Sequence, residues 1–326
     1  MGLDQRHGAK RRFVAPNAYR TQVKRVSICA TQKIGHPRSC GIMNKPAKII
    51  VYSTGSPLKE PFKLMAAMLA DLYAARGLAW RLFVRNISAK YRRTIFGYLW
   101  AILPPLFTSS VWIFLNSQKV FITQPSEIPY PMYVLTGTIL WQIFTSSIYT
   151  PVQVVITSST MLAKINFPRE SLIIAALLEI LFNTVIQIFL LVIVFIYFDI
   201  SISLQTFMSL FGVISLILFG LMIGLLITPI AILYGDIQQA LPMLLQPLFY
   251  LTPIIYTVPK TGVAHVIATY NPISPLIIFT RDLITTGEIH YLWPSFITLI
   301  LTCFFLVAGW VIFRLAMPHL IERISS

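Results

Sequence analysis

From residue 94 to the C-terminus, long apolar stretches without charge alternate with short polar segments. A helix of about 20 apolar residues is long enough to cross the hydrocarbon core of a bilayer. This length predicts six membrane-spanning helices, at about residues 95–115, 132–157, 171–198, 205–233, 239–257 and 289–313. Only Glu179 interrupts the third of them. We therefore predict an all-α integral membrane protein whose six-helix transmembrane domain covers residues 94–326.

The segment after the fifth predicted span has a different pattern. Residues 261–280 lack formal charge, but they contain several polar or helix-breaking residues: Gly262, His265, Asn271, Pro272 and Pro275. Unpaired backbone groups in lipid cost several kcal/mol each, so such a stretch must be shielded by protein or water. We interpret residues 258–288 as an external segment with short re-entrant helices. A seventh span is the alternative.

The composition supports the membrane assignment. The 326 residues are 56% hydrophobic and 11% charged, with a mean hydropathy of +0.74. Soluble domains carry about 25% charged residues. A chain this apolar cannot bury its surplus in one water-soluble core, so the protein and the membrane lipids are expected to be in direct contact.

The basic residues indicate how the chain is oriented. The net charge is +15, but 19 of the 26 Lys and Arg residues precede the first predicted span, which argues against nucleic-acid binding. With six spans and a cytoplasmic N-terminus, the cytoplasmic flanks hold 23 Lys/Arg and the outer flanks hold Lys119, Lys260 and Arg281. The positive-inside rule then places both termini in the cytoplasm.

Motifs for catalysis or metal binding are not evident. Cys29, Cys40 and Cys303 have neither paired nor metal-type spacing, and His265 and His290 lack partners at ligand spacing. The sequence contains no phosphate loop of the form Gly-x-x-x-x-Gly-Lys-Ser/Thr, and no signal-peptide core is visible. We expect a multi-pass bacterial inner-membrane protein that is not an enzyme and holds no cofactor or metal itself.

Two regions precede the first span. Residues 1–56 form a basic extension with few apolar residues, for which we predict disorder: a non-native extension or a tail attracted to anionic lipid. Residues 57–93 predict an amphipathic helix in the headgroup plane, with an apolar arc beside an arginine stripe. The residues that mark this interfacial helix are Trp80, Arg81, Arg85, Tyr91 and Arg92. Packing on a soluble domain is the alternative.

Four sequence blocks, in order, carry a resemblance to a known family. They read "RNISAKYRRT" (85–94) with "GYLWAILPPL" (97–106), "AKINFPRESL" (163–172), "YGDIQQALPMLLQPLFYLTPIIY" (234–256) and "YNPISPLIIFTRDLITTG" (270–287). The chain resembles type-2 ATP-binding-cassette permeases, in particular the polysaccharide-export branch that handles O-antigen, capsule and teichoic acid. One departure is Asn86, where the family usually has an acid.

The resemblance implies a transport function. It implies that two copies form a homodimer around the pathway and that two ABC ATPase subunits, which hold ATP and Mg, dock on the cytoplasmic side. The implied substrate is a polysaccharide, expected to be a lipid-linked glycan. The alternatives are a permease for a lipid or small molecule, an ion-coupled secondary transporter, or an intramembrane transferase.

The loop between the second and third spans is the candidate for ATPase coupling. Resemblance implies a coupling helix at residues 158–170, with Lys164, Phe167, Pro168 and Arg169 as the docking residues. An ordinary basic loop is the alternative, because the positive-inside rule alone would produce one. Phe167 and Pro168 are not needed for topology, and this favours coupling.

Candidates for the pathway or gate lie on the first, third and fifth predicted spans. Pro104 and Pro105 remove two helix donors and predict a kink in the middle of the first span. Glu179 is expected to face the pathway or to pair with a neighbouring helix. Aromatic residues in this family can stack on sugar rings, so the remaining candidates are Trp112, Phe249, Tyr250 and Tyr256.

Overall fold

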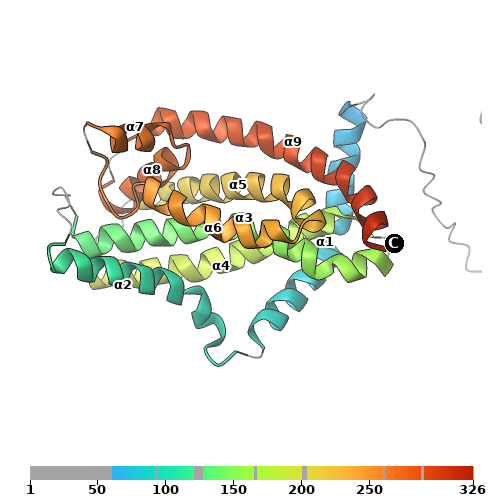
Figure 1. The fold of residues 1–326 in the computed structure, drawn as a ribbon, viewed down its shortest axis with the longest axis horizontal. Helices are drawn as coiled ribbons and strands as arrows, with labels where there is room; N and C mark the ends of the chain where they lie inside the picture. Colours follow the sequence, from blue (N-terminus) through green and yellow to red (C-terminus); the bar gives the residue numbers. More distant parts are fainter. Residues whose placement is uncertain are drawn as a thin grey trace, which may run out of the picture. The chain divides into compact units, whose positions relative to one another are not determined.

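Every element that the structure describes is helical (Figure 1). The computed structural model describes residues 61–92, 94–120, 128–164, 167–199, 204–259, 261–287 and 290–325. Its elements are α1 (Pro61–Tyr91), the 3-10 helix η2 (Gly97–Ala101), α2 (Leu103–Ser117), α3 (Tyr130–Lys164), α4 (Glu170–Tyr197), α5 (Leu204–Leu233), α6 (Asp236–Leu251), α7 (Val263–Tyr270), α8 (Ile273–Thr285) and α9 (Leu292–Ser325). The predicted extension at residues 1–56 lies outside the described part of the chain.

Four of these helices are long and apolar enough to cross a membrane. They are α3, α4, α5 and α9, with apolar segments of 33, 28, 28 and 27 residues. At about 1.5 Å per residue, each of them exceeds the roughly 30 Å of a hydrocarbon core. These helices match the second, third, fourth and sixth predicted spans and confirm an all-α membrane-type fold.

The first and fifth predicted spans contain shorter helices. α2 has 15 residues and α6 has 16, so each reaches only about 22–24 Å at the usual rise. Pro104 and Pro105 stand in the first turn of α2 instead of at the centre of a long helix. A kink in mid-span was therefore the wrong prediction: a residue without a backbone donor is tolerated where helix donors have no partner, and here the prolines begin the helix.

The packing of the long helices shows that α6 must return the chain along the bundle. Gly220 and Gly224 of α5 lie against α3, where an added Cβ would meet the carbonyl oxygens of Phe144 and Ile148 at 2.6 and 2.7 Å. Both positions advance together, so α3 and α5 run parallel at the close distance that small residues permit. Gly309 of α9 lies beside Leu225 and Leu226 of α5, while the first turns of α9 contact α8. The fifth crossing, through α6, stays a prediction, but the chain does travel back there.

The predicted external segment contains two short helices. α7 has 8 residues and α8 has 13, and they are separated at Asn271 and Pro272. No continuous helix crosses residues 261–280, so the alternative of a seventh span is not supported. α8 is largely buried, which provides the protein shielding that an interrupted helix requires. Re-entry into the membrane stays a prediction.

The helix predicted before the first span is present as α1, but it buries a different face. Its buried side chains are Met68, Ala75, Ala79, Leu82, Ile87 and Tyr91, and it packs against α4. Trp80 and Val84, which the predicted apolar arc included, are 57% and 44% exposed. The arc is therefore divided, because small alanines let α1 approach α4 more closely than Trp80 could. The position of α1 in the headgroup plane stays a prediction, with packing on a soluble domain as its alternative.

Candidate functional site

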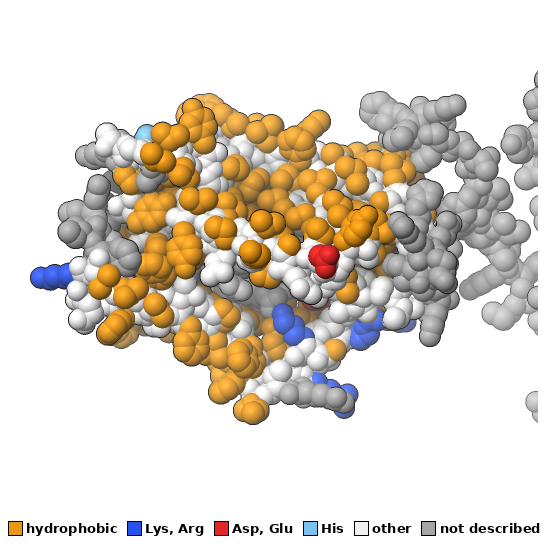
Figure 2. Space-filling model, viewed as in Figure 1, with side chains coloured by type: hydrophobic (Ala, Val, Ile, Leu, Met, Phe, Trp, Pro, Cys, Tyr) orange, Lys and Arg blue, Asp and Glu red, His pale blue; other side chains and the backbone are white. Residues whose placement is uncertain are grey.

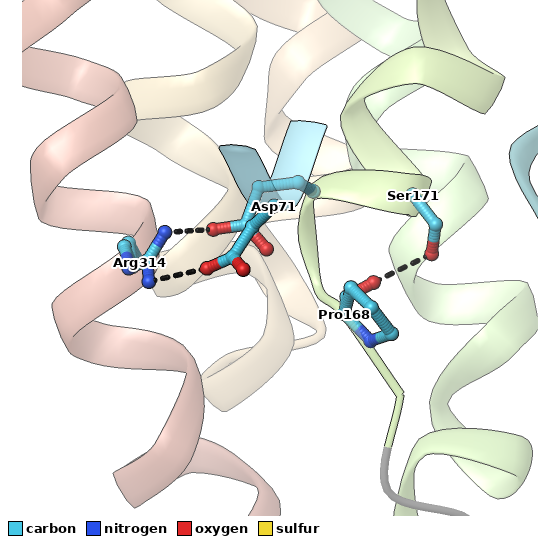
Figure 3. Close-up of polar contacts among 5 residues, drawn as sticks. Asp71, Pro168, Ser171 and Arg314 are labelled. Carbon is cyan, nitrogen blue, oxygen red and sulfur yellow. Dashed lines mark hydrogen bonds and ion pairs between the residues drawn. The ribbon is translucent and has the colours of Figure 1, made fainter. Parts of the chain in front are cut away.

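The turn between α3 and α4 brings three of the four predicted docking residues together. Residues 158–164 continue α3 instead of forming a separate helix, and 167–169 make the turn into α4. The Ser171 hydroxyl and backbone N–H both donate to the Pro168 carbonyl, at 2.7 and 3.1 Å (Figure 3). Phe167 is half-buried against the protein core, whereas Pro168 is exposed. Lys164 ends α3, two undescribed residues before this turn.

An ion cluster fixes the start of α4 directly after this turn. Arg314 of α9 places Nη1 2.6 Å from Oε1 of Glu170 and Nη2 2.6 Å from Oδ2 of Asp71 on α1 (Figure 3). The Glu170 side chain is 6% exposed and lies in the first turn of α4, where a negative charge is favoured by the helix dipole. Sequence reasoning missed this cluster, since its members are 243 and 144 residues apart.

A second polar cluster joins α1 to α4 further along both helices. The Asn86 side-chain amide donates to Oε1 of Glu179 at 2.7 Å, and the Tyr91 hydroxyl donates to Oδ1 of Asn183 at 3.3 Å. Arg85 reaches α3, where it donates to the Ser158 hydroxyl at 3.1 Å. Burial, together with the nearby Glu179 carboxylate, raises the pKa of the Tyr91 phenol. Of the two alternatives for Glu179, the structure shows the pairing with a neighbouring helix.

Asn86, which stands where the resembled family usually has an acid, has a physical consequence in this structure. Asn86 can donate a hydrogen bond to the buried Glu179 carboxylate, whereas an acid at that position would bring two carboxylates together. Arg81 and Arg92 remain exposed, as a headgroup-facing stripe requires, but Arg85 belongs to this polar cluster.

Three of the pathway candidates belong to one aromatic cluster. Trp112 of α2 contacts Tyr250 of α6 edge-on, with ring centroids 6.2 Å apart, and Tyr250 contacts Phe249 at 5.3 Å. Phe249 in turn meets Trp141 of α3 at 5.7 Å. Phe249 is buried, while Tyr250 is 49% exposed. The cluster therefore runs from the core to the surface between α2 and α6.

The surface around this cluster is strongly apolar. Hydrophobic side chains cover much of the face on which α2 and α6 lie (Figure 2). The exposed large side chains of these two helices include Phe107, Val111, Phe114, Met243 and Leu244. Glu179 instead contacts Asn86 of α1, away from the aromatic candidates on α2 and α6.

The break after α6 is held by an arginine that sequence reasoning placed on an outer flank. Arg281 of α8 is 1% exposed and donates from Nη2 to the carbonyls of Pro253 and Ile254, each at 3.1 Å. Its guanidinium lies 3.9 Å from the ring centroid of Tyr133 on α3. The Tyr133 hydroxyl donates to the Tyr256 carbonyl at 2.9 Å. Tyr256 is thus part of a locked turn, apart from the aromatic cluster of α2 and α6.

The described residues offer no group of three His, Cys, Asp or Glu side chains that could hold a metal ion. What they offer is a helical membrane bundle with a polar, ion-paired end and an apolar, aromatic face.

Comparison with known proteins decides the family. The sequence profile described as ABC-2 type transporter matches residues 78–284. The chain belongs to the ABC-2 type transporter family. The matched residues run from α1 to the end of α8 and include the α3–α4 turn, the aromatic cluster and Arg281. Asp71 and Arg314 lie outside them.

Curated relatives of this ABC-2 chain share low identity over long stretches. The O-antigen export system permease protein RfbA of Klebsiella pneumoniae is 24% identical over 238 residues, which cover 71% of this chain and 88% of that protein. The polysialic acid transport protein KpsM of Escherichia coli is 28% identical over 218 residues, 64% of this chain and 81% of that protein. RfbA of Myxococcus xanthus is 28% identical over 109 residues, 33% of this chain and 40% of that protein.

Proposed function

We propose that this chain is the permease subunit of an ATP-driven exporter that carries a polysaccharide, in lipid-linked form, out of the cytoplasm. The observation that carries the proposal is the similarity to O-antigen and polysialic acid permeases over 80% or more of their length. It is supported by the helical bundle, whose family match includes both the turn and the aromatic cluster.

The proposed exporter contains two copies of the chain and two separate ABC ATPase subunits that bind ATP and Mg. The sequence lacks a phosphate loop, which is consistent with ATP hydrolysis on another polypeptide. The proposed location is the bacterial inner membrane with both termini in the cytoplasm. Because Arg281 is buried, only Lys119 and Lys260 of the three outer-flank charges are left to weigh against this orientation.

The aromatic cluster is the proposed contact surface for the glycan. Trp112 and Tyr250 meet at the surface between α2 and α6, and the apolar face of a sugar ring can stack on such rings. A second copy placed against this face would enclose the surface between two protomers. The exposed apolar side chains of α2 and α6 suit such an enclosure better than contact with water.

Reconstitution tests this function directly. The full chain is co-expressed with a candidate ABC ATPase subunit from the same organism, purified and placed in proteoliposomes. We expect the ATPase to co-purify in equal amounts and ATP hydrolysis to rise with lipid-linked glycans but not with the lipid carrier alone. Stimulation by the carrier alone would favour a lipid exporter, and a chain that purifies without the ATPase would overturn the proposal.

A matched pair of variants tests the aromatic surface. Trp112→Ala and Tyr250→Ala should reduce glycan-stimulated hydrolysis, because each removes a ring from the cluster. Trp293→Ala is the control, since Trp293 is 72% exposed at the start of α9 and outside this cluster. Equal activity of all three variants would remove the cluster from the proposed pathway.

A further inference from the structure

Three helices that are distant in sequence meet at one guanidinium group. Arg314 of α9 binds Glu170 with one terminal nitrogen and Asp71 of α1 with the other, both at 2.6 Å. Glu170 is the first residue of α4 and directly follows the turn that contains Pro168 and Arg169. The ion cluster therefore links the residue directly after the proposed docking turn to two other helices (Figure 3).

The geometry of this link is demanding. A guanidinium presents its donors in a rigid planar fork, so two carboxylates on two helices can be held at fixed positions relative to a third helix. Glu170 is the buried partner, with its side chain 6% exposed, and Asp71 is the accessible one, at 45%. Through Glu170 the guanidinium of Arg314 binds α4 to α9, and through Asp71 it also binds α1.

The link between α1 and α4 does not depend on Arg314 alone. Asn86 donates to Glu179, and Tyr91 donates to Asn183, further along the same two helices. Loss of Arg314 would leave α1 attached to α4 by these contacts and by its buried face. What would be lost is the ionic attachment of α9 to Glu170 and Asp71, while Phe313 and Met317 on either side of Arg314 would stay packed in the core.

We propose that Arg314 is a positioning residue that makes the docking turn, α1 and the C-terminal half of α9 move as one unit when the ATPase closes. This inference rests on the proposed function, because it needs an ATPase that presses on the turn. Force applied at Pro168 and Arg169 reaches Glu170 along the backbone, because Arg169 directly precedes Glu170. The ion pairs of Arg314 then transmit it to α9 and to Asp71 of α1. Neither Asp71 nor Arg314 lies within the residues that match the family.

The test compares single and paired neutralisations in the full chain with its ATPase in proteoliposomes. Arg314→Gln leaves the buried Glu170 carboxylate without its partner, whereas the pair Arg314→Gln with Glu170→Gln removes both charges. Both keep Pro168 and Arg169, so the ATPase should still bind. We expect glycan exported per ATP hydrolysed to fall at least about fivefold in both, the lower range of coupling between distant sites. If the single variant fails to fold, the pair carries the test.

A structural readout separates positioning from general stability. In a background without the three native cysteines, spin labels at Tyr73 and Ile312 report the distance between α1 and α9, and labels at Tyr73 and Leu181 report α1 and α4; all three positions are exposed. With nucleotide trapped in the ATPase, we expect the first distance distribution to broaden in the Arg314 variants and the second to stay unchanged. Arg314→Lys should give an intermediate result, since a point charge cannot span both carboxylates as a fork does.

The outcomes for this inference and for the proposed function are distinct. If the native chain neither binds the ATPase nor exports, the proposed function fails. If the native chain works and the Arg314 variants match it in export per ATP and in both distances, only the inference is overturned. Broadening of both distances would also overturn it, because Arg314 would then be a general stabilising residue.

Discussion

The two ends of the bundle each hold an arginine, and their partners differ in kind. Arg314 near the docking turn is 23% exposed in its side chain and binds two carboxylates from two other helices. Arg281 at the opposite end is 1% exposed, and it contacts two backbone carbonyls and the face of Tyr133. One arginine is reached by water and bound to carboxylates, and the other is buried against backbone carbonyls and an aromatic ring.

The exposure of each arginine determines how its end of the bundle can respond to a displacement. In the Arg314 cluster the Asp71 carboxylate has water as an alternative partner, so that pair can rearrange at modest cost, whereas the Glu170 carboxylate is buried and stays tied to the arginine. A buried guanidinium has no water to replace its protein partners. If it moves away, the carbonyls that accept its hydrogen bonds are also left without a donor. We infer that the Arg281 end keeps the break after α6 in one shape, while the Arg314 end can transmit a displacement.

The largest effect is expected for Arg281→Met. The change removes a buried cation–π contact and leaves the carbonyls of Pro253 and Ile254 without their donor. Together these losses should cost at least about 3 kcal/mol of folding free energy. The thermal midpoint in detergent, followed by size-exclusion chromatography, should fall steeply. Arg81→Met, at an exposed position of α1, is the control, and equal midpoints for the two variants would end the distinction between the arginines.

A smaller loss is expected for Gly137→Ala, which tests the same end while the arginine itself stays unchanged in the sequence. A Cβ at Gly137 would lie 2.7 Å from the Ile254 carbonyl and would also meet the Arg281 guanidinium. Overpacking of this kind typically costs about 1–3 kcal/mol. Gly77→Ala in α1 is the matched control, because nothing lies within 4 Å of its Cβ, and it should be neutral or slightly stabilising. If both variants melt alike, the Arg281 end is less tightly packed than the structure shows.

The docking turn at the other end should respond in binding instead of stability. Arg169→Glu and Pro168→Ala change residues of the turn while leaving the apolar helices intact. Charge reversal at an interface weakens association, and we expect about tenfold lower affinity for the ATPase with Arg169→Glu. Phe167→Ala should add a loss of its own, worth on the order of 1.5–3 kcal/mol if the ring is fully buried in the complex.

The control for this prediction is a charge reversal at the opposite end. Lys119→Glu, at an exposed position after α2, should leave ATPase affinity unchanged. Affinity is measured by titrating the purified ATPase into proteoliposomes. Normal binding by all the turn variants would mean that residues 158–170 act only as a topology signal.

The sequence was sufficient for the features that arise from local pattern. Long apolar runs, broken only at Glu179, identified α3, α4, α5 and α9, and helix breakers placed the division between α7 and α8. Pro104 and Pro105 were expected to kink a long helix, but they begin α2. Sequence alone could not distinguish the two outcomes, because proline is found both at kinks and in the first turn of a helix.

The contacts of the arginines could not be predicted in this way. Arg281 and Arg314 each looked like flank charges, since pattern counts a charge without showing its partners. The partners of Arg314 lie 144 and 243 residues away and meet it only when α1, α4 and α9 pack. Those of Arg281 meet it only when α3, α8 and the segment after α6 pack. Glu179 is the instructive exception: its position within an apolar run already required a partner, although the run could not name Asn86.

The smallest effect, and the finest test of the comparison, is expected for Asp71→Asn. Asp71 is the more exposed partner of Arg314, at 45%, so its pair should contribute no more than about 1 kcal/mol. Raising the salt to about 1 M shortens the screening length to about 3 Å, and the difference in thermal midpoint between native protein and Asp71→Asn should then shrink toward zero. The deficit of Arg281→Met should persist at the same salt concentration, because its lost contacts are buried and its carbonyl partners carry no net charge. A salt-independent deficit for Asp71→Asn would show that the Arg314 end is as desolvated as the Arg281 end, and the contrast between the two arginines would fail.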